Sequence, residues 1–191
     1  MNYLAHIHLA HLTQTSMLGN FLGDFVKGND LSDFSSEIQQ GIKLHRSIDT
    51  FTDSHEQVLY LKQQFPDTIR RMSGVVIDIY FDHLLCRHWH QFTDLSMDIV
   101  LPQFYAELSS HQLNVEGRFK AVEKGLLQHR WLADYVKRDS CMRAFNQIEK
   151  RLHHRISFAD EANNHLSTHH DELERIFFSF YPELIKHAKA Y

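Results

Sequence analysis

The scarcity of glycine and proline restricts the possible folds of this chain more than any other feature. Its 191 residues include only seven glycines and three prolines. A many-stranded β-sandwich needs frequent turns, and turns rely on these two residues. The sequence therefore predicts an all-α fold with long uninterrupted helices. The length and the 43% hydrophobic content fit one globular domain, residues 1–191, built as a helical bundle.

Apolar residues recur every three to four positions along most of the chain, as in amphipathic helices. Asp53 followed by Glu56 has the spacing of a capping box that opens a helix. In the last expected helix, Phe178 and Tyr181 are predicted to be exposed, for a dimer contact or a substrate tunnel. The expected helices are 16–27, 35–51, 53–65, 73–90, 98–111, 118–137, 139–154 and 159–188.

Charge and cysteine content exclude several classes of protein. The formal net charge of −4 gives no bulk electrostatic reason for binding nucleic acid. Cys86 and Cys141 form neither a disulfide framework nor a CxxC motif, as expected in a reducing cytoplasm. The N-terminus lacks the basic region of a signal peptide, and no apolar run approaches the roughly 20 residues of a membrane span. A cytoplasmic protein without a membrane partner is predicted.

Acidic residues interrupt three apolar helical segments. His45 and Asp49 are four residues apart, as are Asp78 and Asp82, and so each pair shares one helix face. Asn20 and Asp24 form a third such pair. Two carboxylates about 4 Å apart repel by roughly 4 kcal/mol at an effective dielectric constant near 20. A positive charge must therefore neutralise them.

Two explanations satisfy this requirement. Arginines are the first, and a divalent cation is the second. A mixed histidine and carboxylate site suits Mn²⁺, Mg²⁺ or Fe²⁺ better than structural zinc, and such an ion activates water against a phosphodiester. A non-catalytic helical protein with arginine-paired acids remains the alternative, in which His6, His8 and His11 only line a half-exposed N-terminal segment. The candidate arginines are Arg46, Arg70, Arg71 and Arg87.

Five motifs carry a resemblance to a known family: "MNYLAHIHLA", "GNFLGDFVKG", "GIKLHRSIDTFTD", "DIYFDHLLCRHW" and "FYPEL". In this order they resemble the bacterial acyl carrier protein phosphodiesterases. The resemblance implies an enzyme that hydrolyses the phosphodiester between 4′-phosphopantetheine and the serine of holo acyl carrier protein. It also implies a divalent metal, most often Mn²⁺, and a distant, atypical relation to the HD phosphohydrolases.

The resemblance also implies roles for particular residues. The HD pattern is not kept, because His45 is followed by Arg46 and the adjacent pair is reversed as Asp82–His83. Arg46 is the expected phosphate clamp, and His83 or His6 is expected to protonate the leaving serine oxygen. His83 is also a candidate for an outer metal ligand. The implied metal ligands are Asp24, His45, Asp49, Asp78 and Asp82.

The implied partner is acyl carrier protein, which is strongly acidic as a family, so we expect a local basic docking surface. The candidate segments are 69–71, Arg87, 118–124 and 150–155. No nucleic-acid partner is expected, and the sequence sets no oligomeric state. Two other functions remain open: an HD-like hydrolase of nucleotides or small phosphodiesters, and a non-catalytic helical binding module.

Overall fold

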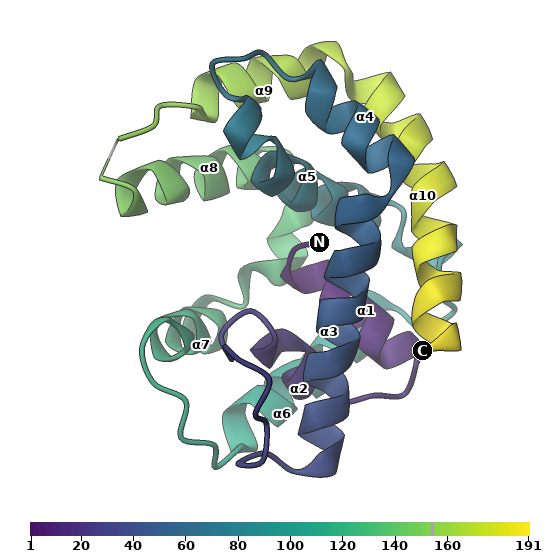
Figure 1. Ribbon diagram of the computed structural model, residues 1–191, viewed down its shortest axis with the longest axis vertical. Coiled ribbons are helices and arrows are strands. Elements are labelled where there is room, and N and C mark those ends of the chain that lie inside the picture. The colour runs from purple at the N-terminus through teal and green to yellow at the C-terminus, as the bar shows by residue number, and fades with distance from the viewer. Residues whose placement is uncertain (154) are drawn as a thin grey trace.

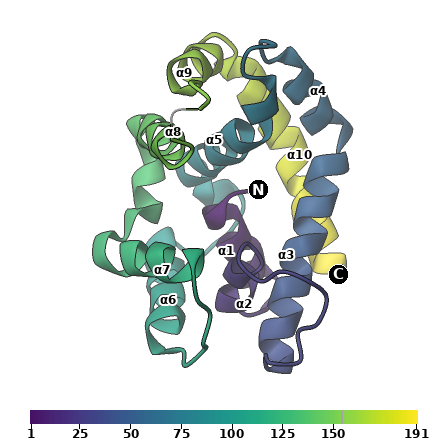
Figure 2. The ribbon, with the colours of Figure 1, turned by 60° about the vertical axis from the view of Figure 1, so that its left-hand side comes forward.

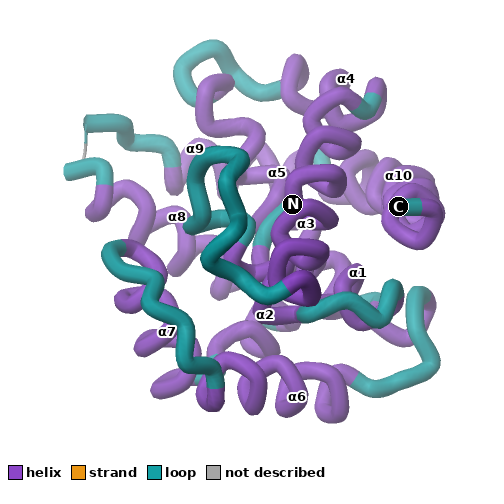
Figure 3. The backbone as a smooth tube through the Cα atoms, turned by 60° about the horizontal axis from the view of Figure 1, so that its bottom comes forward, coloured by secondary structure: helices purple, strands orange, loops and turns teal. Residues whose placement is uncertain are grey.

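A computed structural model describes residues 1–153 and 155–191. Helices are the only regular elements in these residues (Figures 1 and 3), which confirms the all-α prediction. The α-helices are α1 (Tyr3–Leu12), α2 (Met17–Leu22), α3 (Ser36–Ser54), α4 (Glu56–Gln64), α5 (Ser73–Arg87), α6 (Met97–Ser110), α7 (Arg118–His129), α8 (Asp139–Arg151), α9 (Ala159–Thr168) and α10 (His170–Ala190). Three short 3₁₀ helices are η1 (Arg70–Met72), η2 (Trp89–Gln91) and η3 (Trp131–Val136).

Helix α1 occupies the centre of the fold. Every residue from Tyr3 to Ala10 is buried, and helices α2, α3, α5 and α10 pack around it (Figure 1). A helix that is apolar on all sides is stable only when other elements cover it completely. His6 and His8 are therefore core residues, 1% and 0% exposed. The alternative of a half-exposed environment is wrong for these two, whereas His11 is half-buried.

Two glycines let α2 and α3 approach backbone to backbone. A Cβ atom on Gly19 would lie 2.7 Å from the carbonyl oxygen of Ile38, and one on Gly41 would lie 2.6 Å from the amide nitrogen of Asn20. Any larger residue at either position would push the two helices apart. This close packing holds the side chains of α2 next to those of α3.

Several predicted helix boundaries are wrong. The helix expected over 16–27 ends at Leu22, and the one expected over 159–188 is divided at His169 into α9 and α10. The proposed capping box at Asp53 does not form, because α3 continues to Ser54 and α4 begins after His55. Asp53 instead forms an ion pair with Lys62 at 2.8 Å.

Tyr181 corrects the prediction of exposed aromatic residues on the last helix. Its side chain is fully buried, and its hydroxyl lies 2.8 Å from Nδ1 of His8. Phe178 is half-buried against His88 and Phe92. These aromatic rings therefore belong to the packing between α10 and the rest of the fold.

The helices follow an arc, with α4 and α9 at one end and α6 and α7 at the other (Figure 1). The N-terminus of α1 lies between the two ends, and α7, η3 and α8 follow one another on the left-hand side of Figure 2. Within the described residues, no helix has the length and apolar character needed to cross a membrane.

Candidate functional site

Two histidines and one aspartate converge at the middle of the arc. Nε2 of His6 on α1 lies 3.1 Å from Oδ1 of Asp49, and Nε2 of His45 lies 3.0 Å from Oδ2 of the same carboxylate. The two imidazole rings stack with centroids 3.9 Å apart. One potential ligand atom from each residue lies within 4.8 Å of the others. The spacing of His45 and Asp49 on α3 predicted two of these three residues, and α1 supplies the third.

Helix α2 holds both imidazoles in place. Nδ1 of His6 contacts Oδ1 of Asn20 at 2.9 Å. A Cβ atom on Gly23 would lie only 2.2 to 2.6 Å from atoms of the His45 side chain, so the imidazole packs directly on the glycine backbone. Asn20 fixes the orientation of one ring, and Gly23 leaves space for the other.

The α-ammonium group of Met1 connects this cluster to Asp78. It is fully buried and lies 3.2 Å from Oδ1 of Asp49 and 3.2 Å from Oδ1 of Asp78. Burial lowers the pKa of the ammonium, but Asp78 and Asp49 raise it to about 10 overall. The ammonium is therefore positively charged at neutral pH. It supplies part of the positive charge that neutralises the carboxylates of Asp49 and Asp78.

Arginine does not neutralise these acids. Within residues 1–153 and 155–191, Asp49, Asp78 and Asp82 form no ion pair with any arginine. Burial raises the pKa of Asp49, but contacts with His45 and His6 and the charge of the ammonium outweigh it and hold the pKa far below its ordinary value. Burial of the Asp78 carboxyl raises its pKa, although the ammonium opposes this shift.

The protonation of His6 fits a cation at this site. Burial and the neighbouring His45 lower the pKa of His6 to about 4, although Asp49 opposes the shift, so the ring is neutral at pH 7. Nδ1 of His6 lies 2.9 Å from Oδ1 of Asn20, and Nε2 lies 3.1 Å from Oδ1 of Asp49. A neutral imidazole carries its hydrogen on one ring nitrogen and a lone pair on the other, so it can offer one nitrogen to a cation. This donor set suits a divalent metal.

Solvent reaches the site from one side. The side chains of Asp49 and Asp78 are 38% and 33% exposed, whereas those of His6 and His45 are almost completely buried. The buried imidazoles fix the inner part of the site, and the half-exposed carboxylates form its outer part. A molecule arriving from solvent would meet the carboxylates first.

Asp82, on α5, lies outside this cluster. Its carboxylate contacts the N-terminal turn of α1. Its Oδ2 accepts a hydrogen bond from the amide of Leu4 and its Oδ1 accepts one from Ala5, both at 2.9 Å. Burial raises the pKa of Asp82 to about 7, although these two hydrogen bonds oppose the shift. A carboxylate in this position caps the helix that carries His6.

The other predicted site residues also lie outside the cluster. Nδ1 of His83 donates to the carbonyl oxygen of Tyr135 at 2.6 Å. Nη2 of Arg46 donates to the carbonyl oxygens of Val26 and Gly28 at 3.2 and 2.7 Å. Asp24 is half-buried, and its charge contributes to the raised pKa of Tyr3. Their proposed roles stay predictions.

Three residues at the site were not predicted. Asn20 was seen only as the partner of Asp24 in a spacing pattern, although its position in a glycine-flanked segment indicated close packing. Gly23 was read as one residue of a motif, and nothing in the sequence showed which side chain it would meet. The ammonium of Met1 had no signal in the side-chain pattern at all.

Comparison with known proteins identifies relatives over almost the whole chain. A family model described as acyl carrier protein phosphodiesterase matches residues 1–184. Three bacterial relatives with that same name are 37% identical (Klebsiella pneumoniae strain 342), 34% (Escherichia coli O6:K15:H31) and 32% (Pectobacterium atrosepticum). The matches cover 98–100% of this chain and 97–98% of the relatives. No solved structure matches significantly, so the relation to HD enzymes stays a prediction. The chain belongs to the acyl carrier protein phosphodiesterase family.

Proposed function

We propose that this protein hydrolyses the phosphodiester between 4′-phosphopantetheine and the serine of holo acyl carrier protein, giving apo carrier and 4′-phosphopantetheine. The family match and the relatives of that name support the substrate and the reaction. The convergence of His6, His45 and Asp49 is the observation that carries the proposal for the site. Potential metal ligands from two helices, α1 and α3, meet at a point that solvent reaches.

We propose that His6, His45 and Asp49 hold a divalent metal ion, with Mn²⁺ as the first candidate and Mg²⁺ and Fe²⁺ as alternatives. When bound, such an ion lowers the pKa of a coordinated water and offsets the charge of the phosphodiester. With its hydrogen on Nδ1, beside Oδ1 of Asn20, His6 would present Nε2 to the ion. Nε2 of His45 and the Asp49 carboxylate complete the set.

Asp78 is the group we assign to proton transfer. The Met1 ammonium lies 3.2 Å from both its carboxyl and that of Asp49. One third of the Asp78 side chain is exposed, and burial raises its pKa. A carboxylate with a raised pKa is a better proton acceptor for an attacking water than an ordinary one. Asp82 is a positioning residue in this proposal, because it holds the first turn of the helix on which His6 lies.

Turnover of different substrates tests the function. The enzyme should release 4′-phosphopantetheine from holo carrier with Mn²⁺ present, and Asp49→Asn should abolish this release without unfolding the protein. Hydrolysis of nucleotides or small phosphodiesters at rates equal to those with the carrier would indicate a general phosphohydrolase instead. Full activity of the Asp49→Asn variant would remove the His6–His45–Asp49 cluster from the mechanism.

A further inference from the structure

The positive charges of this chain are concentrated in one segment. Residues 118–155 contain ten of the twenty lysines and arginines but only four of the 24 aspartates and glutamates. The segment therefore has a formal charge of +6, while the rest of the chain has a formal charge of −10. We call residues 118–155 the basic segment. His154 within it lies outside the described residues.

Most of these cations are available to a partner. All ten lysines and arginines of the basic segment are exposed except Arg138, which is half-buried. In the described part of the chain, only Lys120 among them forms an ion pair, with Glu123 at 3.7 Å. Neighbouring carboxylates therefore leave most of this charge uncompensated. A cluster of exposed, unpaired cations attracts anionic partners over a range near the Debye length.

The basic segment is also joined directly to the candidate site. Nη2 of Arg118 donates to the hydroxyl of Tyr3 at 2.9 Å, and Nδ2 of Asn2 donates to the hydroxyl of Tyr135 on η3 at 3.2 Å. Asn2 and Tyr3 follow Met1, whose ammonium contacts Asp49 and Asp78. The start of α7 and helix η3 therefore contact the two residues that follow Met1.

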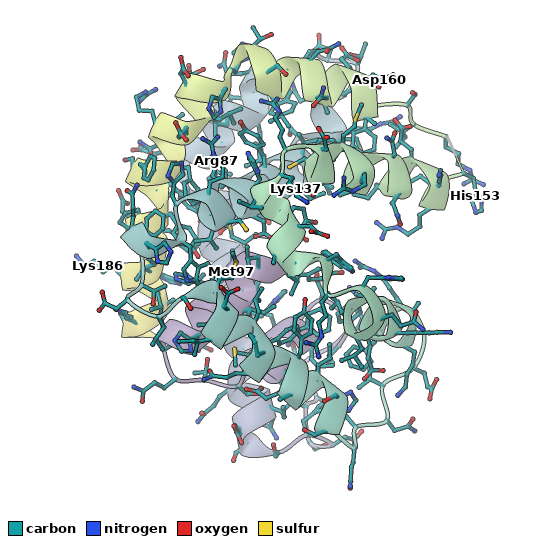
Figure 4. The ribbon with its side chains drawn as sticks, turned by 180° about the vertical axis from the view of Figure 1, so that it is seen from behind. Arg87, Met97, Lys137, His153, Asp160 and Lys186 are labelled. Atoms are coloured by element: carbon teal, nitrogen blue, oxygen red, sulfur yellow. The ribbon has the colours of Figure 1, made fainter. Side chains whose placement is uncertain are left out.

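The ribbon places the three helices of the basic segment on one side of the arc. In Figure 2, α7, η3 and α8 follow one another on the left-hand side. Seen from behind in Figure 4, Lys137 is at the junction of η3 and α8, and His153 is beyond the far end of α8. An exposed apolar side chain, Val136, 49% exposed, precedes Lys137. Cations around an apolar contact suit a protein surface.

We propose that the basic segment is the docking surface for an acidic protein, the carrier whose phosphodiester the site hydrolyses. This inference rests on the proposed function. The basic segment contains two of the four candidate docking segments, 118–124 and 150–155. The proposal favours these two over Arg87 and 69–71. Electrostatic docking of this kind increases the association rate and places the phosphodiester at the site.

Charge reversal with a matched control tests the proposal. The test variant carries Lys124→Glu, Lys137→Glu and Lys150→Glu, one change each in α7, the η3–α8 junction and α8. The control variant carries Lys43→Glu, Lys186→Glu and Lys189→Glu on α3 and α10, also at exposed positions. Both variants change the net charge by the same amount. KM and kcat are measured with holo carrier, Kd with apo carrier, and kcat/KM with bis(4-nitrophenyl) phosphate.

The test variant should raise KM and Kd for the carrier about tenfold or more, with kcat and small-diester hydrolysis within about twofold of the parent. The control variant should stay within about twofold for all four quantities. Equal KM values in the two variants, with the parent active, would overturn the docking surface and leave the proposed function standing. If the parent neither binds nor hydrolyses the carrier, the proposed function fails and this inference fails with it.

Two further measurements keep the test decisive. If the triple variant does not fold, as judged by circular dichroism, the three single charge reversals are measured, and each should raise KM by a smaller factor. A fluorescent single-stranded DNA of 20 nucleotides tests the other class of anionic partner. Binding of this DNA more tightly than the carrier, and its loss in the test variant, would overturn the assignment in favour of nucleic acid.

Discussion

The imidazole rings of His6 and His45 stack with their centroids 3.9 Å apart, and both direct Nε2 at the carboxylate of Asp49. The two histidines are 39 positions apart and lie on different helices. Two stacked imidazoles cannot both carry a positive charge without strong repulsion. Burial and His45 lower the pKa of His6 to about 4, so that ring stays neutral and its nitrogen remains a donor for a metal ion.

Replacing Asp49 tests the metal site against a neighbour on the same helix. Asp49→Asn removes the charge that both imidazoles face, so we expect loss of Mn²⁺ binding by isothermal titration calorimetry and loss of turnover. Asp53→Asn is the matched control, because Asp53 is 75% exposed and pairs only with Lys62. An exposed ion pair contributes about 0–1 kcal/mol. Equal metal affinity in the two variants would contradict the site.

Adding one methyl group at Gly23 should displace His45. A Cβ atom there would lie 2.2 to 2.6 Å from side-chain atoms of His45, so Gly23→Ala should reduce Mn²⁺ affinity about tenfold or more, as changes that shift a ligand's orientation do. Gly125→Ala in α7 is the control, because no atom lies within 4 Å of the added Cβ. It should stabilise the protein by about 0.5–1 kcal/mol. Unchanged metal affinity in Gly23→Ala would show that His45 is not a ligand.

Asp82→Asn should destabilise α1. The carboxylate accepts from the amides of both Leu4 and Ala5, and an asparagine offers one oxygen for these two donors. Leaving one buried N–H unsatisfied costs about 1–3 kcal/mol, which urea denaturation measures. Because α1 carries His6, metal affinity should fall as well. A variant with unchanged stability at pH 8, where Asp82 is ionised, would contradict the capping role.

His8 should make the protein less stable in acid. Burial lowers the pKa of His8 from 6.5 to about 3, so between these pH values the unfolded chain binds one more proton than the folded chain. The free energy of unfolding therefore rises with pH in this range, by about 1.4 kcal/mol per pH unit for this group. His8→Gln should reduce the slope by about that amount in urea titrations from pH 4 to 6. An unchanged slope would mean that His8 is protonated in the folded protein.

The sequence predicted the elements of this fold better than their ends. Scarce glycine and proline indicated helices, and the apolar pattern of 73–90 matched α5 to within three residues. The division of 159–188 at His169 was missed because the apolar periodicity continues through it. The Asp53 capping box was wrong because α3 continues through Asp53 to Ser54 and α4 begins only after His55. Where one helix ends and the next begins depends on how the two pack together.

At the site, too, residue spacing within one helix was predictable, whereas contacts between helices were not. His45 and Asp49 were predicted together because one helix holds both at fixed spacing. The pairing of Asp78 and Asp82 on one face was equally local, but their partners are not. Asp78 meets the Met1 ammonium and Asp82 meets the first turn of α1, and only the packing of α1 against α5 separates their roles.

The most direct test of the account is intact-mass spectrometry of holo acyl carrier protein incubated with the enzyme, first with EDTA and then with excess Mn²⁺. The account predicts that the carrier keeps its mass in EDTA, loses the mass of 4′-phosphopantetheine once Mn²⁺ is added, and keeps its mass throughout with Asp49→Asn. Loss of the phosphopantetheine mass in EDTA would contradict the metal site. An unchanged carrier mass with folded enzyme and Mn²⁺, Mg²⁺ or Fe²⁺ would contradict the proposed reaction.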